Sequence, residues 1–235
     1  MLPYFYYPDI KGSQLMLDED TSKHMIGVLR MQQGEELTLT DGKGQKALAR
    51  ITNDNRKKCV VDIISITKDE SRSPAVHIAI SLVKNSTRFE WFLEKATEIG
   101  VSHILPVICE RTEKEKFRAD RLHQILVSAM IQSQQSWMPV LSAPVSVDQL
   151  IRKEWRGPKF IAHCLPEHKQ SLSGISANGT GDSLILIGPE GDFSPGEIKL
   201  ALDHGFIPVS LGETRLRTET AGVVAATLLV MGPHQ

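Results

Sequence analysis

The sequence has 235 residues, enough for one large or two small domains, and a formal net charge of −1 at pH 7. This charge excludes a strong overall attraction to a polyanion, so any contact with nucleic acid needs a local basic patch. Three cysteines without paired spacing argue against a disulfide framework. Because no metal-ligand pattern, signal peptide or membrane-spanning run is recognisable, we expect a cytoplasmic protein that binds neither a metal nor a membrane.

Residues 1–70 are predicted to form a small β-rich domain. Strand-like runs lie at residues 4–7, 36–40, 47–51 and 59–66. Residues 41–44, Asp-Gly-Lys-Gly, have the composition of a hairpin turn. Asp20 or Thr21 is expected to cap a short helical segment. Several short strands separated by turns favour a small barrel.

Basic residues gather on the predicted hairpin and on the turn that follows it. They are Lys43, Lys46, Arg50, Arg56, Lys57 and Lys58. A solvated hairpin surface is the simplest interpretation of such a cluster. A surface that contacts RNA phosphates is the alternative.

Residues 74–235 alternate between apolar strand-like runs and helical segments. Strands are expected at residues 76–82, 104–108, 160–163, 184–187 and 206–211. Thr87 with Glu90, and Ser194 with Glu197, have the spacing of capping boxes at helix starts. A last helix, expected at 221–231, is apolar nearly all round. The alternation indicates a mostly parallel α/β sheet.

Two of the predicted strands end in glycine loops. The first strand leads into Gly-Pro-Glu-Gly at 188–191, and the second leads into Gly212 and a polar stretch. In a parallel sheet such loops lie at the carboxyl ends of the strands, where ligands bind. Ordinary βα turns would also explain the glycines. Three charged residues crowd the second loop and favour a functional site there: Arg215, Arg217 and Glu219.

The runs Leu-Ile-Gly-Pro-Glu-Gly at 186–191 and Arg-Leu-Arg-Thr-Glu-Thr-Ala at 215–221 resemble the signature of the bacterial 16S ribosomal RNA (uracil-N3)-methyltransferases. The pattern His-x-x-x-Val-Leu-Arg at 24–30 is similar to the amino-terminal domain of the same family. The family belongs to the SPOUT class. The resemblance therefore implies a trefoil-knotted, mostly parallel sheet over residues 74–235, preceded by an RNA-binding PUA-like β-barrel over residues 1–70. Trp137 stands where the family commonly has an arginine, and it could either stack on a base or pack within the protein.

The resemblance also implies S-adenosylmethionine as the cofactor, bound by three loops at 163–167, 187–191 and 211–221. The residues expected to contact the cofactor are His163, Leu165, Ile187, Gly188, Pro189, Gly191, Leu211, Gly212, Leu216, Thr220 and Ala221. The residues expected to contact RNA are Arg30, Lys43, Lys46, Arg50 and Arg215.

Methylation at uracil N3 requires removal of a proton and in-line attack on the methyl group. The uracil anion carries negative charge on O2 and O4, which a fixed guanidinium can stabilise. Arg217 is the first candidate for that role and Arg215 the second. Glu190 or Glu219 is either the general base or an orienting residue. A structural Arg217–Glu219 pair that only shapes the loop is the alternative.

The expected partners are 16S ribosomal RNA in the small ribosomal subunit and a second copy of the chain, because the helix at 221–229 has no polar face. Two other function classes stay open. One is a SPOUT enzyme that modifies another RNA, such as transfer RNA, and the other is a noncatalytic RNA-binding or assembly protein. A Rossmann methyltransferase is disfavoured because no Gly-x-Gly-x-x-Gly follows a leading strand.

Overall fold

The structure is a computed structural model that describes residues 2–113, 116–166, 168–175 and 181–232. Glu167, at the end of one expected cofactor loop, lies outside the described residues. The chain divides into two compact units, Met1–Ser71 with Met130–Met138, and Arg72–Ala129 with Pro139–Gln235. Nothing in the sequence indicated that residues 130–138 belong with the first unit.

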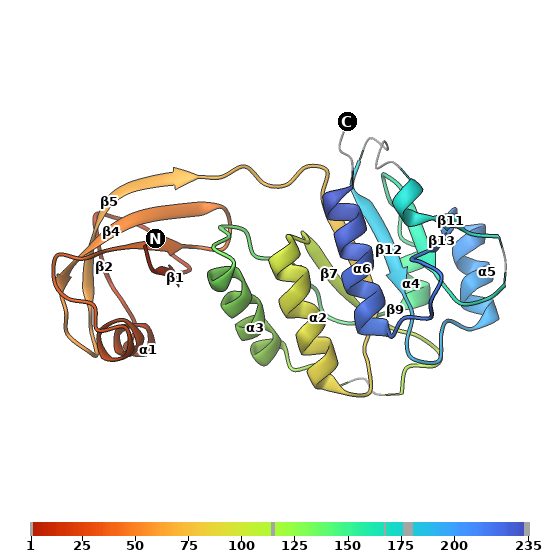
Figure 1. The fold of residues 1–235 in the computed structure, drawn as a ribbon, viewed down its shortest axis with the longest axis horizontal. Coiled ribbons are helices and arrows are strands. Elements are labelled where there is room, and N and C mark those ends of the chain that lie inside the picture. The colour runs from red at the N-terminus through yellow and green to blue at the C-terminus, as the bar shows by residue number, and fades with distance from the viewer. Residues whose placement is uncertain (1, 114–115, 167, 176–180, 233–235) are drawn as a thin grey trace. The chain divides into compact units, whose positions relative to one another are not determined.

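The first unit contains a curled five-stranded sheet in the order β1-β3-β4-β5-β2 (Figure 1). The strands are β1 (Tyr4–Tyr6), β2 (Gln14–Met16), β3 (Glu36–Thr40), β4 (Gln45–Asn53) and β5 (Val60–Lys68). β1 pairs with β3 in parallel, and the other neighbours are antiparallel. The strands form because apolar and polar side chains alternate, so that Leu37, Leu39, Ala47, Ala49 and Ile51 bury one face.

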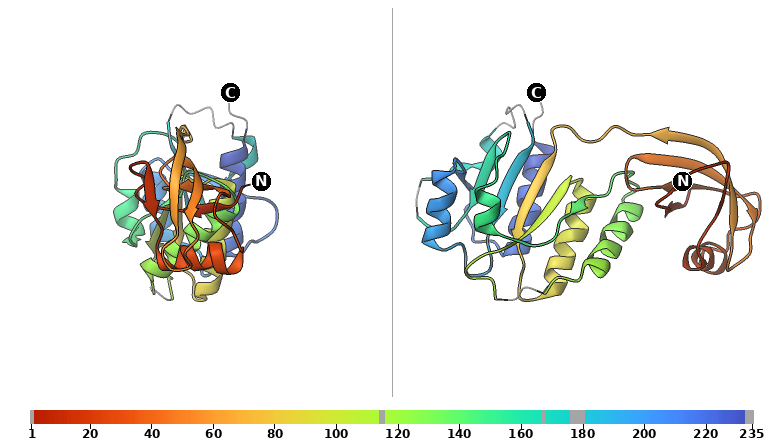
Figure 2. Two further views of the ribbon diagram at one scale, coloured as in Figure 1. Left: turned by 90° about the vertical axis from the view of Figure 1, so that its left-hand side faces the viewer. Right: turned by 180° about the vertical axis from the view of Figure 1, so that it is seen from behind.

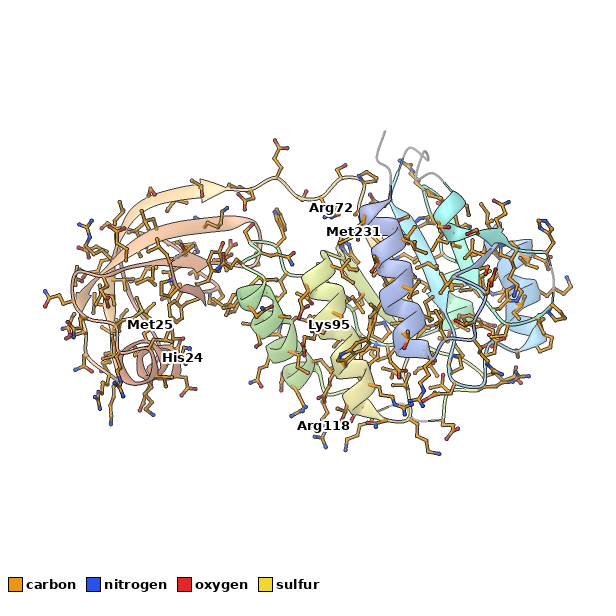
Figure 3. All side chains as sticks on the ribbon, viewed as in Figure 1. His24, Met25, Arg72, Lys95, Arg118 and Met231 are labelled. Atoms are coloured by element: carbon orange, nitrogen blue, oxygen red, sulfur yellow. The ribbon has the colours of Figure 1, made fainter. Side chains whose placement is uncertain are left out.

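The helical segment of this unit begins earlier than predicted. α1 (Glu19–Ser22) starts after Asp18, whose carboxylate accepts a hydrogen bond from the Thr21 N–H at 2.9 Å. Asp18 is therefore the cap, in place of Asp20 or Thr21. The chain continues as the π-helix η1 (Lys23–Val28), in which Met25 is buried and His24 is exposed (Figure 3).

Residues 130–138 pack against the hairpin turn at 41–44. The indole of Trp137 lies over Gly44, where an added Cβ would come within 2.5 Å of the ring. Trp137 Nε1 also donates to the carbonyl oxygen of Asp69 at 3.2 Å. Trp137 is 36% exposed and packs within its own unit, which supports the packing interpretation of this residue.

The second unit is an α/β sheet in the order β11-β13-β10-β12-β6-β7-β8, with β9 also beside β7. Its strands are β6 (Val76–Ser81), β7 (His103–Ile108), β8 (Val140–Leu141), β9 (Val145–Ser146), β10 (Lys159–Ala162), β11 (Gln170–Ser171), β12 (Ser183–Ile187) and β13 (Ile207–Ser210). The pairings are parallel. β6 and β12 are buried at every position, as expected for central strands covered on both faces.

Helices cover both faces of this sheet. α2 (Ser86–Ile99) and α6 (Thr218–Met231) lie side by side on one face (Figure 1). α4 (Val147–Ile151) and α5 (Pro195–Asp203) cover the other face, which is visible from behind (Figure 2). α3 (Ala119–Gln132) is tied to α2 by two hydrogen bonds from Arg121 to Glu90, of 2.6 and 2.7 Å. The short 3-10 helix η2 (Leu172–Gly174) precedes β12.

One predicted capping box is confirmed and one is wrong. Ser194 and Glu197 form the reciprocal pair at the start of α5. α2 begins after Asn85, whose side chain accepts from the Thr87 N–H at 3.0 Å, because asparagine is itself a strong cap. Glu90, the predicted partner of Thr87, pairs with Arg121 instead.

Close packing of α6 depends on a glycine. A Cβ on Gly222 would lie 2.7 Å from Phe92 Cε2 and 2.8 Å from Ile80 Cδ1, so the helix approaches α2 and β6 where it has no side chain. At the other end of α6, Arg72 donates to the carbonyl oxygen of Val230 at 3.2 Å (Figure 3). In the part of the chain that the structure describes, neither α6 nor any other helix has the length and apolar character to cross a membrane.

Gly222→Leu should destabilise the second unit, because the new side chain collides with Phe92 and Ile80. Overpacking of this kind costs about 1–3 kcal/mol in the free energy of unfolding. Gly196→Leu is the matched control, since residue 196 of α5 is exposed and a Cβ there meets nothing closer than Ser194 Oγ at 3.8 Å. Urea unfolding of both variants measures the difference, and equal midpoints would contradict this packing.

Candidate functional site

A cavity of about 630 Å³ opens where β10, β12 and β13 end. It is lined by three segments, together with Lys169 and Ala221: residues 162–164 at the end of β10, residues 187–190 and 192 at the end of β12, and residues 209–218 from the end of β13 to the start of α6. This is the edge of a parallel sheet at which ligands bind. Its volume falls within the range of about 300–1,000 Å³ found for small-molecule sites.

Most residues predicted to contact a cofactor meet at this cavity. Those that line it are His163, Ile187, Gly188, Pro189, Leu211, Gly212, Leu216 and Ala221. Leu165, Gly191 and Thr220 do not line it. Leu165 packs against the apolar core beneath α4 and α5 instead.

The loop at 188–192 is held in place from several sides. Four hydrogen bonds to neighbouring segments anchor it: Thr218 Oγ1 to the Gly188 carbonyl (3.0 Å), the Lys84 N–H to Glu190 Oε1 (3.1 Å), Arg111 Nη1 to the Gly191 carbonyl (2.8 Å), and the Cys164 N–H to Asp192 Oδ2 (2.8 Å). Arg111 also packs its aliphatic chain against Gly191, where a Cβ would lie 3.3 Å from Arg111 Cβ. Because residue 191 is glycine, Arg111 can pack against the loop at 188–192 from outside the cavity.

The second glycine loop passes directly into α6. Arg217 is the extended residue before the helix, and Thr218 is its first residue, so α6 begins three residues before the predicted start. Thr218 is buried, and its bond to the Gly188 carbonyl joins the two glycine loops. Gly212 has a φ of 142°, in the region that favours glycine, so the turn depends on this residue type.

The four catalytic candidates do not share one environment. Arg215, Arg217 and Glu190 are exposed and line the cavity. Glu219 is 7% exposed and is not part of the lining. Its Oε1 lies 3.6 Å from Arg88 Nε on α2, so the alternative of an Arg217–Glu219 pair is not observed.

Two cysteines near the strand ends differ in exposure to solvent. Burial raises the pKa of the Cys109 thiol to about 12, so this group stays protonated at neutral pH. Cys164 is exposed and lines the cavity. Across the described ranges, no group of three or more His, Cys, Asp or Glu side chains is placed to hold a metal ion.

The expected RNA-contacting residues are divided between the two units. Arg30, Lys43, Lys46 and Arg50 belong to the first unit, and Arg215 belongs to the second. Lys46 pairs with Asp69 at 2.8 Å, and Arg50 pairs with Glu36 at 2.7 Å. Arg30 and Lys43 are exposed, and Arg30 has a φ of 58°.

Known RNA methyltransferases are similar to this chain over most of its length. A family model described as an RNA methyltransferase domain matches residues 70–230, and one described as an RNA methyltransferase PUA domain matches residues 17–64. Ribosomal RNA small subunit methyltransferase E from Mycobacterium bovis is 30% identical over 238 residues, which cover 96% of this chain and 90% of that protein. The chain belongs to the ribosomal RNA small subunit methyltransferase E family. Its Synechocystis relative is 31% identical over 84% of this chain, and the match spans 66% of that relative.

Solved structures of methyltransferases have the same fold. A probable rRNA-methyltransferase from Porphyromonas gingivalis has a TM-score of 0.91 and 40% identity, covering 98% of each chain. Ribosomal RNA small subunit methyltransferase E from Neisseria gonorrhoeae, solved bound to S-adenosyl methionine, has a TM-score of 0.87 and 28% identity, also covering 98% of each chain. The predicted α/β fold with an amino-terminal PUA-like domain is therefore confirmed.

In this family member, sequence reasoning missed several polar residues of the cavity wall. Cys164, Lys169 and Asp192 line the cavity but were not among the predicted contacts. Sequence signals could have found two of these three residues. Cys164 lies inside the expected loop at 163–167, and Asp192 directly follows the glycine run at 188–191.

Proposed function

We propose that this chain is an S-adenosylmethionine-dependent methyltransferase that methylates N3 of one uridine in the 16S ribosomal RNA of the small subunit. The observation that carries the proposal is the cavity at the ends of β10, β12 and β13, with Arg215 and Arg217 in its lining. Family membership supports the reaction class, and the cofactor bound by the Neisseria gonorrhoeae relative supports the cofactor.

The cavity residues fit S-adenosylmethionine, which supplies an electrophilic methyl group when bound. Ile187, Leu211 and Leu216 provide apolar walls for an adenine ring. Gly188 and Gly212 line the cavity without a side chain, so a ligand can approach the backbone of both loops closely. The remaining predicted contacts at Leu165, Gly191 and Thr220 would act by shaping this wall.

The full-length chain should bind S-adenosylmethionine, and Gly212→Val should weaken binding at least tenfold. The loss comes from backbone strain, because Gly212 has a φ of 142° and a Cβ there would meet no atom within 4 Å. Gly205→Val, at a φ of 79° after α5 and away from the cavity, is the matched control. Isothermal calorimetry measures both, and a folded wild-type chain that binds no cofactor would reject the proposal.

The proposed chemistry requires an accessible pairing edge. Uracil N3 carries a proton in a base pair, so the uridine must be unpaired or extruded. Arg217 stabilises the developing anion, and Arg215 is the second donor. Glu190 is exposed at the cavity and is our candidate for the general base, whereas the burial of Glu219 beside Arg88 suits a residue that holds the start of α6.

Arg217→Ala should lower kcat while leaving cofactor affinity close to that of the wild type. Removing one donor to a developing anion typically costs about 3 kcal/mol, which is about a hundredfold or more in rate. Arg152→Ala, an exposed arginine after α4, is the matched control. Single-turnover methylation and calorimetry separate the two effects. Equal losses in rate and affinity would mark Arg217 as a structural residue.

We propose that residues 1–70 bind RNA and that residues 74–235 carry out methyl transfer. The PUA family model supports the first role. Because Lys46 and Arg50 already have carboxylate partners, Arg30 and Lys43 are the stronger candidates for phosphate contacts. A chain of net charge −1 should bind naked RNA weakly, because phosphate contacts dominate such binding. The substrate should therefore be an assembled small subunit that presents the uridine.

Methylated N3 blocks base pairing, so reverse transcriptase should stop at one position in 16S ribosomal RNA from cells that contain this protein. The stop should vanish in cells that lack it and return when deficient subunits are treated with the enzyme and S-adenosylmethionine. Primer extension along both ribosomal RNAs tests this. Identical stops in both strains would reject the substrate, and a mark found only in transfer RNA would favour the alternative enzyme.

We also propose a homodimer that acts in the cytoplasm. Met231 at the end of α6 is 70% exposed, and Trp91 on the neighbouring helix α2 is 42% exposed, so apolar surface is available for a second copy. Light scattering at micromolar concentration should give twice the 26.1 kDa mass of one chain. A monomeric mass would contradict the dimer.

A further inference from the structure

Asp192 combines a position in the cavity wall with a strained backbone. Its φ is 65°, in the left-handed region that L side chains rarely adopt. Among the described residues, three that are not glycine have a positive φ, and Asp192 is the one that lines the cavity. Strain of this kind persists where surrounding contacts hold it, and it is concentrated at functional sites.

The side chain of Asp192 joins two of the three loops that form the cavity. Asp192 Oδ2 accepts a hydrogen bond from the backbone N–H of Cys164 at 2.8 Å, across 28 residues of sequence. The Asp192 N–H donates to the Pro189 carbonyl at 3.0 Å and closes the turn after β12. Because the acceptor is a carboxylate, its bond to the loop after β10 is stronger than one between neutral groups.

The loop after β10 has a second anchor on its other side. Lys169 Nζ donates to the His163 carbonyl at 2.7 Å. The peptide group between residues 163 and 164 is thus held on both sides: Lys169 donates to its carbonyl oxygen, and the carboxylate of Asp192 accepts from its N–H. Both of those side chains belong to residues of the cavity wall.

We propose that Asp192 is a positioning residue that fixes the loop after β10 against the loop after β12 and so pre-forms the cofactor cavity. The inference rests on the proposed function, since it takes S-adenosylmethionine as the ligand. A wall that is already ordered binds without the cost of ordering it. Without the carboxylate, the Cys164 N–H loses the acceptor that the structure records and the wall between the two loops loosens.

A direct charge contact is the competing role for Asp192. A carboxylate close to the sulfonium would favour S-adenosylmethionine over S-adenosylhomocysteine, which lacks that positive charge. Positioning of the wall makes no such distinction, because both ligands contact the same two loops. The ratio of the two affinities therefore separates positioning from charge attraction.

The experiment compares four variants of the full-length chain by calorimetry with both ligands. Asp192→Ala and Asp192→Gly remove the acceptor, and glycine also relieves the backbone strain. Asp192→Asn keeps an acceptor oxygen and tolerates the positive φ. Asp203→Ala, which removes an exposed aspartate of α5 paired with Lys199, is the matched control.

We expect the Kd for both ligands to rise about tenfold in Asp192→Ala and Asp192→Gly, which is the range for loss of one charge-assisted hydrogen bond. The Kd of Asp192→Asn should stay within about threefold of the wild-type value, because asparagine retains an acceptor oxygen. The Kd of Asp203→Ala should stay within the same limit, because Asp203 is remote from the cavity. At saturating cofactor, kcat should change little in any of the four. This split between affinity and rate, with rescue by asparagine, would not arise from general destabilisation.

Three results would overturn the inference. Unchanged affinity in both Asp192→Ala and Asp192→Gly would show that the contact does not shape the cavity. Wild-type affinity in Asp192→Gly alone would show that backbone strain, and not the bond to Cys164, controls binding. A selective loss of S-adenosylmethionine in Asp192→Asn would assign Asp192 to a charge contact. Failure of the wild type to bind either ligand would instead reject the proposed function, and this inference with it.

Discussion

The register of three parallel strands determines where the cavity lies. Ala162 at the end of β10 is opposite both Ile187 of β12 and Val209 of β13, so the three strands end at one level of the sheet. β12 is buried at every position and pairs in parallel with both β6 and β10, so these strand ends lie at the covered centre of the sheet. The loops that follow therefore begin beside one another, although more than twenty residues of sequence separate each loop from the next.

Hydrogen bonds to the loops hold them in place where the strand register brings them together. Loop backbone at a sheet edge has no strand partner, so its polar groups must pair with side chains or water. Thr218 supplies a donor to one carbonyl of the loop after β12, and Arg111 supplies a donor to another. The position of Thr218 depends in turn on α6, which packs closely on α2 and β6 because residue 222 is glycine. Core packing is thus linked to the shape of the cavity through a short series of contacts.

Much of the second unit could be predicted because its local signals agree with its fold. Apolar runs of four to six residues that end in glycine turns are too short for buried helices and indicate buried strands, and Ser194 with Glu197 marks a helix start that the structure confirms. Local patterns failed where a stronger competitor or a distant contact decided the outcome. Asn85 caps α2 in place of Thr87, and Trp137 packs on Gly44, which is distant in the sequence. Aspartate adopts a left-handed backbone more readily than most residues, but residue type alone does not indicate that Asp192 is the one that does so. The trefoil knot depends on the path of the whole chain and stays a prediction.

Charge pairing in the first unit restricts how it can hold RNA. Lys46 and Arg50 lie on the face of β4 opposite the core, and each has a carboxylate within 2.8 Å. A phosphate that binds either cation must compete with Asp69 or Glu36, so the gain from releasing counterions is reduced. Nonspecific attraction to RNA should therefore be weak, as the net charge of −1 already indicates. If this face binds RNA as we propose, an RNA that places several phosphates there at once would be favoured, because it would displace both carboxylates.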